Sequence, residues 1–364
     1  MIRPVLYVDL PGIIYAIDRR ARARNSEFAH FICTPDAEDA RASLSSWLGS
    51  LFPINPAAST WLCEDHWRIL GVAQARRRAG GCAWDLMYLG SLPNRSVEPV
   101  RDDDVLMELI EYALNAAITR GVQRVFAKVD HETPDIELFT RCSFQRYARE
   151  VTFCLPEVPK PGPLPDLSLR RWSRHDEWGL LRLYAAGAPR TVQVAESVES
   201  HEYAQLRVGS LRRWQRLLLP VMEEGFVYDL GVRLGGWVQV RYGRGSRPHQ
   251  IALMVHPDNA DLATPLLRFG LSLLGEGGAK PVYCQVREYE GAVVSALRDA
   301  GFEQMGTRVL LVRHLTLRAM RQRFVPALEQ RVVYGVKGLG TAQTHYQGAV
   351  VQDYGGSEAA ARKR

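Results

Sequence analysis

The feature that most constrains this fold is an order of elements that occurs twice along the 364 residues. The second copy, residues 225–311, is predicted to hold three strands, a long helix, a strand, a short helix and a final strand. The first copy, residues 61–155, follows the same order. The equivalent positions Val151 and Val309 are about 158 residues apart, far above the ~20–50 residue period of solenoid repeats. We therefore predict a duplicated domain.

The spacing inside the two copies supports this duplication. Val125 to Phe144 covers 19 positions, and Val282 to Phe302 covers 20. Each copy also has one long segment with apolar residues at the spacing of an amphipathic helix. The second of these helices is predicted to start at Thr264, with a proline following the capping residue. The apolar positions are Val105, Leu106, Leu109, Ile110, Ala113, Leu114 and Ala117 in the first copy, and Leu262, Leu266, Leu267, Leu271 and Leu274 in the second.

The predicted domain boundaries come from a proline-rich stretch between the copies. Residues 156–165 contain five prolines, and such a stretch forms neither a helix nor a central strand. We predict an N-terminal domain over residues 1–155, a linker over 156–166 and a C-terminal domain over 167–315. Residues 316–364 are predicted to form a basic helix and a flexible, glycine-containing tail outside both cores.

Composition limits the compartments and the partners that are expected for this protein. The sequence has no run of ~18 apolar residues and no signal-peptide pattern, so we expect a cytoplasmic protein that does not cross a membrane. None of the six cysteines is spaced as a metal-binding or redox pair, and no metal site is predicted. The net charge is +6, which alone is weak evidence for nucleic acid. Nucleic acid is therefore not an expected partner, and nothing in the sequence excludes an oligomer.

Two short motifs resemble the GNAT superfamily of N-acetyltransferases. One is Met254-Val255-His256-Pro257, which leads into the long helix of the second copy. The other is Ala300-Gly301-Phe302, at the end of the short helix before the final strand. With the order of elements, these motifs identify the chain as similar to a tandem GNAT protein. The resemblance implies a mixed α/β fold with two acyl-CoA N-acyltransferase-like domains.

The resemblance also implies a cofactor and a reaction. Acetyl-CoA, or another acyl-CoA, would lie beside the strand that precedes the long helix, and its acyl group would pass to an amine on a small molecule or a protein. In this family a glycine-rich loop presents backbone amides to the pyrophosphate. The second copy instead has Asp258, Asp261 and Pro265 near those positions, and the first copy has Asp102–Asp104. The remaining candidates for cofactor binding are Met254, Val255, Leu262, Ala263 and Thr264.

Catalytic residues are harder to assign. The family's usual general acid is a tyrosine in the short helix, and the corresponding residues here are Leu297 and Phe139, which cannot donate a proton. Asp85 lies near the place where the family often has a carboxylate that deprotonates the amine. His256 could act as a base near neutral pH. Asp85 and His256 are thus the catalytic candidates, although both residue types are also common in purely structural roles.

The sequence leaves two functions open. One is an acyl-CoA-dependent N-acyltransferase in which the second copy is the better candidate for binding CoA. The other is a catalytically degenerate GNAT-like pair, a pseudoenzyme kept as a binding or assembly module. The lost glycines and the lost tyrosine favour the second function, whereas the family resemblance favours the first.

Asp261 gives a more specific expectation. A carboxylate ~5 Å from a pyrophosphate would cost roughly 3 kcal/mol at an effective dielectric constant of 20, or about a hundredfold in affinity. If the second copy binds CoA, Asp261→Gly is therefore expected to tighten binding.

Overall fold

The computed structural model describes residues 1–9, 30–33, 58–66, 68–78, 82–91, 103–158, 167–197, 223–243, 248–275 and 280–315. All of them belong to one compact unit, residues 1–318. The predicted tail and most of the predicted linker lie outside the described residues. In the part of the chain described, no helix is both long and apolar enough to cross a membrane.

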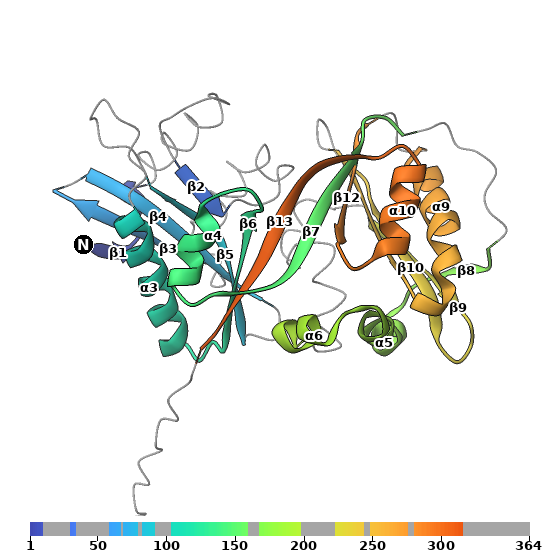
Figure 1. Ribbon diagram of the computed structural model, residues 1–364, viewed down its shortest axis with the longest axis horizontal. Coiled ribbons are helices and arrows are strands. Elements are labelled where there is room, and N and C mark those ends of the chain that lie inside the picture. The colour runs from blue at the N-terminus through green and yellow to red at the C-terminus, as the bar shows by residue number, and fades with distance from the viewer. Residues whose placement is uncertain are drawn as a thin grey trace, which may run out of the picture. The chain divides into compact units, whose positions relative to one another are not determined.

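The first copy has the predicted order of elements (Figure 1). Antiparallel strands come first, then a long helix, a strand parallel to its predecessor, a short helix and a long final strand. The elements are β1 (Ile2–Pro4), η1 (Tyr7–Asp9), β2 (His30–Cys33), β3 (Ala58–Asp65), β4 (Arg68–Arg77), β5 (Ala83–Ser91), α3 (Asp103–Thr119), β6 (Arg124–Asp130), α4 (Asp135–Arg141) and β7 (Gln145–Leu155).

The second copy repeats this order, and the described part of its start also contains two α-helices. Its elements are β8 (Leu169–Arg171), η2 (Arg174–Asp176), α5 (Glu177–Gly187), α6 (Arg190–Glu196), β9 (Glu223–Asp229), β10 (Leu234–Arg241), β11 (His249–Val255), η3 (Pro257–Leu262), α9 (Ala263–Gly275), β12 (Val282–Arg287), α10 (Gly291–Asp299) and β13 (Glu303–His314). The predicted start of the long helix was wrong in detail. The 3-10 helix η3 runs directly into α9, so Thr264 lies inside the first turn and does not cap it.

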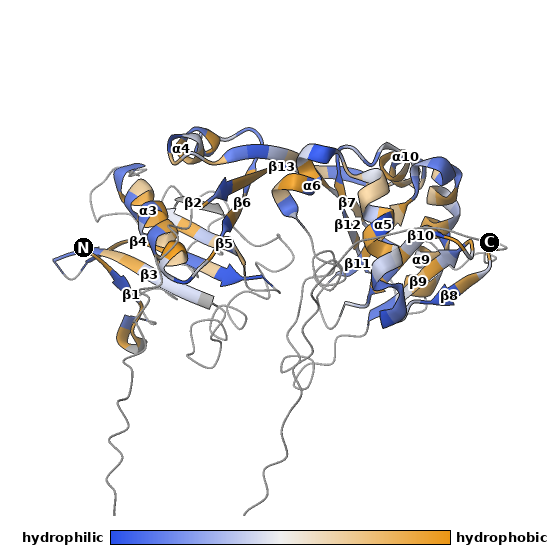
Figure 2. Ribbon diagram, turned by 90° about the horizontal axis from the view of Figure 1, so that it is seen from below, coloured by the Kyte–Doolittle hydropathy of each residue, from blue (hydrophilic) through white to orange (hydrophobic). Residues whose placement is uncertain are grey.

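The two long helices cover the sheet with the faces that periodicity predicts. All seven predicted residues of α3 are buried, and so are all five predicted residues in and before α9. Helix α3 packs on β3, β4 and β5, and α9 packs on β10 and β11. Figure 2 shows hydrophobic residues concentrated on α9 and on the neighbouring β10. Burying these apolar faces is the main favourable contribution to each core.

The ends of the two short helices show the duplication at atomic detail. The Phe144 N–H donates to the Phe139 carbonyl, and the Phe302 N–H donates to the Leu297 carbonyl, both at 3.0 Å. The residue before each phenylalanine is left-handed, with φ of 58° at Ser143 and 83° at Gly301. This is the usual C-terminal cap of a helix, in which glycine is preferred. The first copy therefore keeps the conformation although serine has replaced the glycine.

Within the described residues, hydrogen bonding joins the copies into one 13-stranded sheet, whereas the sequence predicts a sheet for each copy. The last strand of the second copy, β13, lies between β6 and β7 of the first copy and pairs antiparallel with both. Strand β7 pairs in turn with β12 of the second copy. The middle of the sheet therefore has the order β6-β13-β7-β12 (Figure 1). Each copy is completed by a strand from the other.

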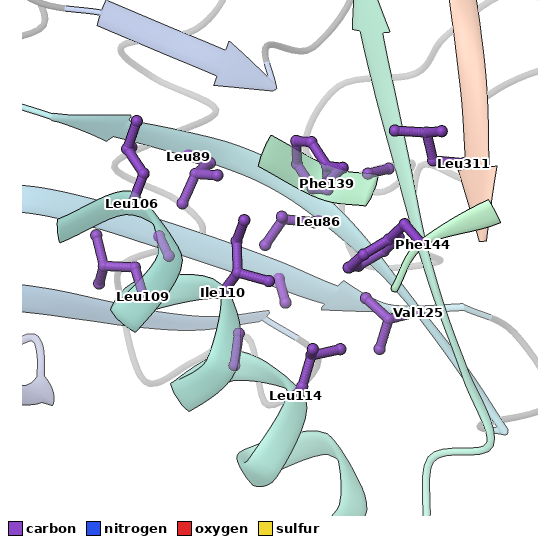
Figure 3. Packing of buried hydrophobic residues seen from close by; sticks show 14 of the residues in the cluster. Leu86, Leu89, Leu106, Leu109, Ile110, Leu114, Val125, Phe139, Phe144 and Leu311 are labelled. Carbon is purple, nitrogen blue, oxygen red and sulfur yellow. The ribbon is translucent and has the colours of Figure 1, made fainter. Parts of the chain in front are cut away.

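The exchanged strands also carry core residues. Val309 and Leu311 of β13 belong to the hydrophobic core of the first copy. Figure 3 shows Leu311 among Phe139, Phe144 and other residues of that core. Phe153 and Leu155 of β7 belong in the same way to the core of the second copy. Neither core is complete without the other half of the chain.

An ionic cluster around the buried Glu150 carboxylate lies on the strands of this junction. The Glu150 carboxylate of β7 is 2.7 Å from the Lys128 ammonium of β6 and 3.3 Å from the Arg287 guanidinium of β12. Burial by itself would raise the pKa of Glu150, but the two cations outweigh it and lower this pKa to about 2. Glu150 is therefore ionised near neutral pH and links strands from both copies.

We predict that Leu311→Ala destabilises the protein by about 2–5 kcal/mol, because it leaves a cavity in a core built mostly by the other copy. Leu311 is fully buried, whereas Met305 of the same strand is 60% exposed. Met305→Ala should therefore change stability by no more than about 0.5 kcal/mol. Urea unfolding of both variants measures the difference, and equal costs would contradict the placement of β13 in the first core.

A second prediction concerns pH. Because the folded-state pKa of Glu150 is depressed, its contribution to stability is full above the unfolded pKa of ~4.3 and declines as pH falls towards 2. The stability gap between wild type and Glu150→Gln should therefore narrow from pH 5 to pH 3 in urea unfolding. Glu288→Gln is the control, because Glu288 pairs with Arg149 at 3.5 Å and both are exposed. A gap that does not change with pH would argue against the charged cluster.

Candidate functional site

Strands β11 and β12 pair over only part of their length, which opens the sheet of the second copy. Their parallel register covers His249↔Val282, Gln250↔Tyr283 and Ile251↔Cys284. Beyond this point β11 continues to Val255 and β12 continues to Arg287, and these ends do not pair with each other. The strands therefore diverge just before the loop that leads into α9.

A cavity of about 230 Å³ lies at this divergence. Its walls come from α5, the end of β11, the start of η3 and the start of α10. Met254 and Val255, both predicted to bind the cofactor, lie in the wall, as does His256. Tyr184 and Tyr289 add further polar groups to a mainly apolar lining. A concave, mostly apolar site with few polar groups is typical of small-molecule binding.

The other three predicted cofactor residues lie elsewhere. Leu262 and Ala263 are 8% and 2% exposed and belong to the hydrophobic core of the second copy. The Ala263 N–H donates to the Ala260 carbonyl within the loop. Thr264 is partly buried in the first turn of α9. Among the described residues that line the cavity, Ala260 is the nearest in sequence to these three.

The loop after β11 is held by its own side chains. The Asp258 N–H donates to His256 Nδ1 at 3.2 Å, and the Asn259 N–H donates to the His256 carbonyl at 2.8 Å. Arg233 donates to the Asp258 carboxylate at 2.8 Å, and the same guanidinium nitrogen is 3.3 Å from His256 Nε2. The hydrogen bond from Arg233 lowers the pKa of Asp258, so this carboxylate is ionised at neutral pH. His256 thus caps η3, with both ring nitrogens facing protein groups.

Tyr184 connects the cavity wall to the ionic cluster at the junction. Its hydroxyl donates to Glu196 Oε2 at 2.7 Å, and Glu196 Oε1 accepts from Arg287 at 3.1 Å. Arg287 also lies 3.3 Å from Glu150. Sequence reasoning did not identify Tyr184, Glu196 or Arg287 as site residues. Because they come from α5, α6 and β12, no local pattern in the sequence relates them.

The equivalent opening of the first copy is closed. Pairing of β5 with β6 ends at Leu86↔Ala127. It therefore stops part of the way along the strands, like the pairing of β11 with β12. Strand β2 then pairs with the same edge of β5, with register partners His30↔Ser91, Phe31↔Gly90 and Cys33↔Leu89. Strand β2 also contacts β6. Protein backbone thus occupies the place where the second copy has its opening.

Asp85 lies in the first copy and is committed to an ion pair. Its carboxylate is 2.6 Å from the Arg78 guanidinium, which also stacks 3.7 Å from the centre of the Phe126 ring. Burial would raise the pKa of Asp85, but Arg78 outweighs burial and lowers it. A carboxylate with a lowered pKa is a weaker base. Asp85 is also remote from His256, because five strand steps separate β5 from β11 in the sheet.

The residues at the family's tyrosine position are not available to a ligand. Phe139 and Leu297 are both 0% exposed and lie in the cores of their copies. A general acid in either copy would therefore have to come from another position. In the second copy, Tyr184 and Tyr289 are the tyrosines in the cavity wall.

Two solved structures have a similar fold. A GCN5-related N-acetyltransferase from Sphaerobacter thermophilus has a TM-score of 0.56 at 14% identity, with 86% of this chain and 95% of that chain covered. A tandem GNAT protein from the clavulanic acid biosynthesis pathway has a TM-score of 0.54 at 16% identity, with 86% and 98% covered. The sequence matches no family model and no curated protein. The repeated order of elements and these two likenesses show that the chain has the tandem GNAT acetyltransferase fold.

Proposed function

We propose that this protein is an acyl-CoA-dependent N-acyltransferase whose donor binds in the cleft of the second copy. The observation that carries the proposal is the divergence of β11 and β12 into a cavity lined by Met254 and Val255. The first copy does not offer this space, because β2 pairs with β5 at the equivalent place. We therefore infer one donor site in each chain.

In this proposal the two copies have different roles. Residues 167–315 bind the donor, and residues 1–155 complete the sheet by contributing β7. The acceptor is an amine on a small molecule or a protein, and the expected compartment is the cytoplasm. The amine nitrogen attacks the thioester carbonyl, the carbon–sulfur bond breaks, and the proton lost by the amine ends on the released thiol.

His256 remains the candidate base of this reaction. It lies in the cavity wall, and imidazole is well suited to proton transfer near neutral pH. To accept a proton from the amine, a ring nitrogen of His256 must first give up its contact with the Asp258 N–H or with Arg233 and then contact the amine. Asp85 could serve only a reaction in the first copy, so the proposed reaction does not use it.

One observation favours the alternative function, a degenerate pair that acts as a binding or assembly module. In GNAT enzymes the loop equivalent to the one after β11 binds pyrophosphate. Here it forms a 3-10 helix whose start is held by hydrogen bonds among His256, Asp258 and Arg233. A protein that no longer binds an acyl donor would tolerate such a loop. The two functions differ in a simple way, because only the enzyme requires the cleft to bind a donor.

We predict that Gly291→Phe abolishes the stabilisation of the protein by acetyl-CoA. Gly291 lies in the cavity wall, and an added Cβ would meet no atom within 4 Å. The added side chain therefore starts in open space at the cavity wall, and we expect the phenyl ring to reduce the space left for the donor. For the wild type, acetyl-CoA at ~100 times its dissociation constant should add about 2.7 kcal/mol of stability. Thermal unfolding with and without acetyl-CoA measures this, and calorimetric titration should give one site per chain.

Gly306→Phe is the matched control. Gly306 in β13 also has no atom within 4 Å of an added Cβ, and it is not among the residues that line the cavity. This variant should bind acetyl-CoA as the wild type does. If Gly291→Phe also binds normally, the cleft is not the site. If the wild type itself shows no binding, the assembly module replaces the enzyme as the preferred function.

A further inference from the structure

We propose that the cleft of the second copy recognises its donor through the acyl-pantetheine arm alone and has no subsite for the diphosphate of CoA. This inference rests on the proposed function, since it assumes that the cleft binds a thioester donor. It departs from the GNAT pattern, in which loop amides hold the pyrophosphate. Three observations on the loop and the cavity support it.

The first observation is the use of the loop amides. The N–H groups of Asp258, Asn259 and Ala263 all donate within the loop, to His256 Nδ1, the His256 carbonyl and the Ala260 carbonyl. The segment is kinked at Asn259, where φ is −125° and ψ is 40°. Pro257 and Pro265 have no N–H. These three N–H groups and the two prolines therefore offer no free donor to a phosphate, whereas the family's loop presents a row of outward amides.

The second observation is the charge of the loop. Asp258 and Asp261 are both exposed there, and the interaction with Arg233 keeps Asp258 ionised. Arg233 is a nearby cation, but its guanidinium bonds Asp258 and faces His256. In the described part of this loop, residues 256–265, the charged side chains are thus the two aspartates. A diphosphate beside them would meet like charge.

The third observation is the size of the cavity. Its volume of about 230 Å³ is below the ~300–1,000 Å³ of sites that enclose a whole drug-sized ligand. The cavity can therefore hold the thiol end of a pantetheine arm, with or without its acyl group, between the end of β11 and the start of α10, with the rest of the donor outside. The same arm is carried by CoA and by a protein-bound phosphopantetheine, so both sources fit this chemistry.

The test is calorimetric titration of the full chain with CoA, 4′-phosphopantetheine and pantetheine. CoA carries the nucleotide, and 4′-phosphopantetheine represents the arm as a carrier protein presents it. We expect the three dissociation constants to agree within about tenfold, because the shared arm provides the binding. Binding of CoA more than tenfold tighter than both other probes would overturn the inference while leaving the donor site intact. Absence of binding by all three would reject the donor site itself.

Asp261→Asn provides a second test. It distinguishes repulsion between the Asp261 carboxylate and the diphosphate of CoA from a general loss of structure. Removing this exposed carboxylate should tighten CoA binding by about fivefold, which is less than the hundredfold expected for an unscreened charge, because solvent weakens the interaction. Pantetheine has no phosphate, so its affinity should not change. Asp299→Asn is the control, since Asp299 is an exposed carboxylate at the end of α10, outside the cavity wall. An equal gain for pantetheine, or no gain for CoA, would contradict the proposed repulsion.

Discussion

The backbone hydrogen bonds of β13 determine how this protein is put together. Strand β13 begins in the second copy but pairs along its length with β6 and β7 of the first. Without β13, the edges of β6 and β7 that it joins would present unpaired N–H and C=O groups, which proteins seldom leave buried. The reciprocal pairing of β7 with β12 does the same for the second copy. The two copies therefore share one sheet, and each contributes residues to the core of the other.

The two copies contain similar openings in their sheets, but different elements of the chain lie beside each opening. In both copies, parallel pairing stops after three or four residues, and the strands then diverge. In the first copy β2 occupies the edge of β5. In the second copy α5 and the start of α10 form the walls of a cavity. The same step of the fold is thus covered by a strand in the first copy and borders a cavity in the second.

The predictable part of the molecule is the part controlled by local pattern. Periodicity identified the buried face of α3, residue by residue, and the spacing of Phe144 and Phe302 matched two equivalent helix caps. The site was only partly predictable. Met254 and Val255 lie in the cavity wall because a strand end places them there. Leu262 and Ala263 do not, because η3 turns them into the core. Asp258 of η3 accepts a hydrogen bond from Arg233, which lies on the connection between β9 and β10 and is therefore distant from η3 in the sequence.

The sequence alone determined that there are two copies, what elements each contains and which glycines and tyrosines of the GNAT pattern are missing. These are properties of residue order and short-range spacing. Only the tertiary structure decided that the copies exchange strands, that β2 closes one opening, and that Tyr184, Glu196 and Arg287 meet beside the other. The physical reason is that strand pairing and buried ion pairs join residues far apart in the chain, and their partners are selected by geometry that no local sequence pattern encodes.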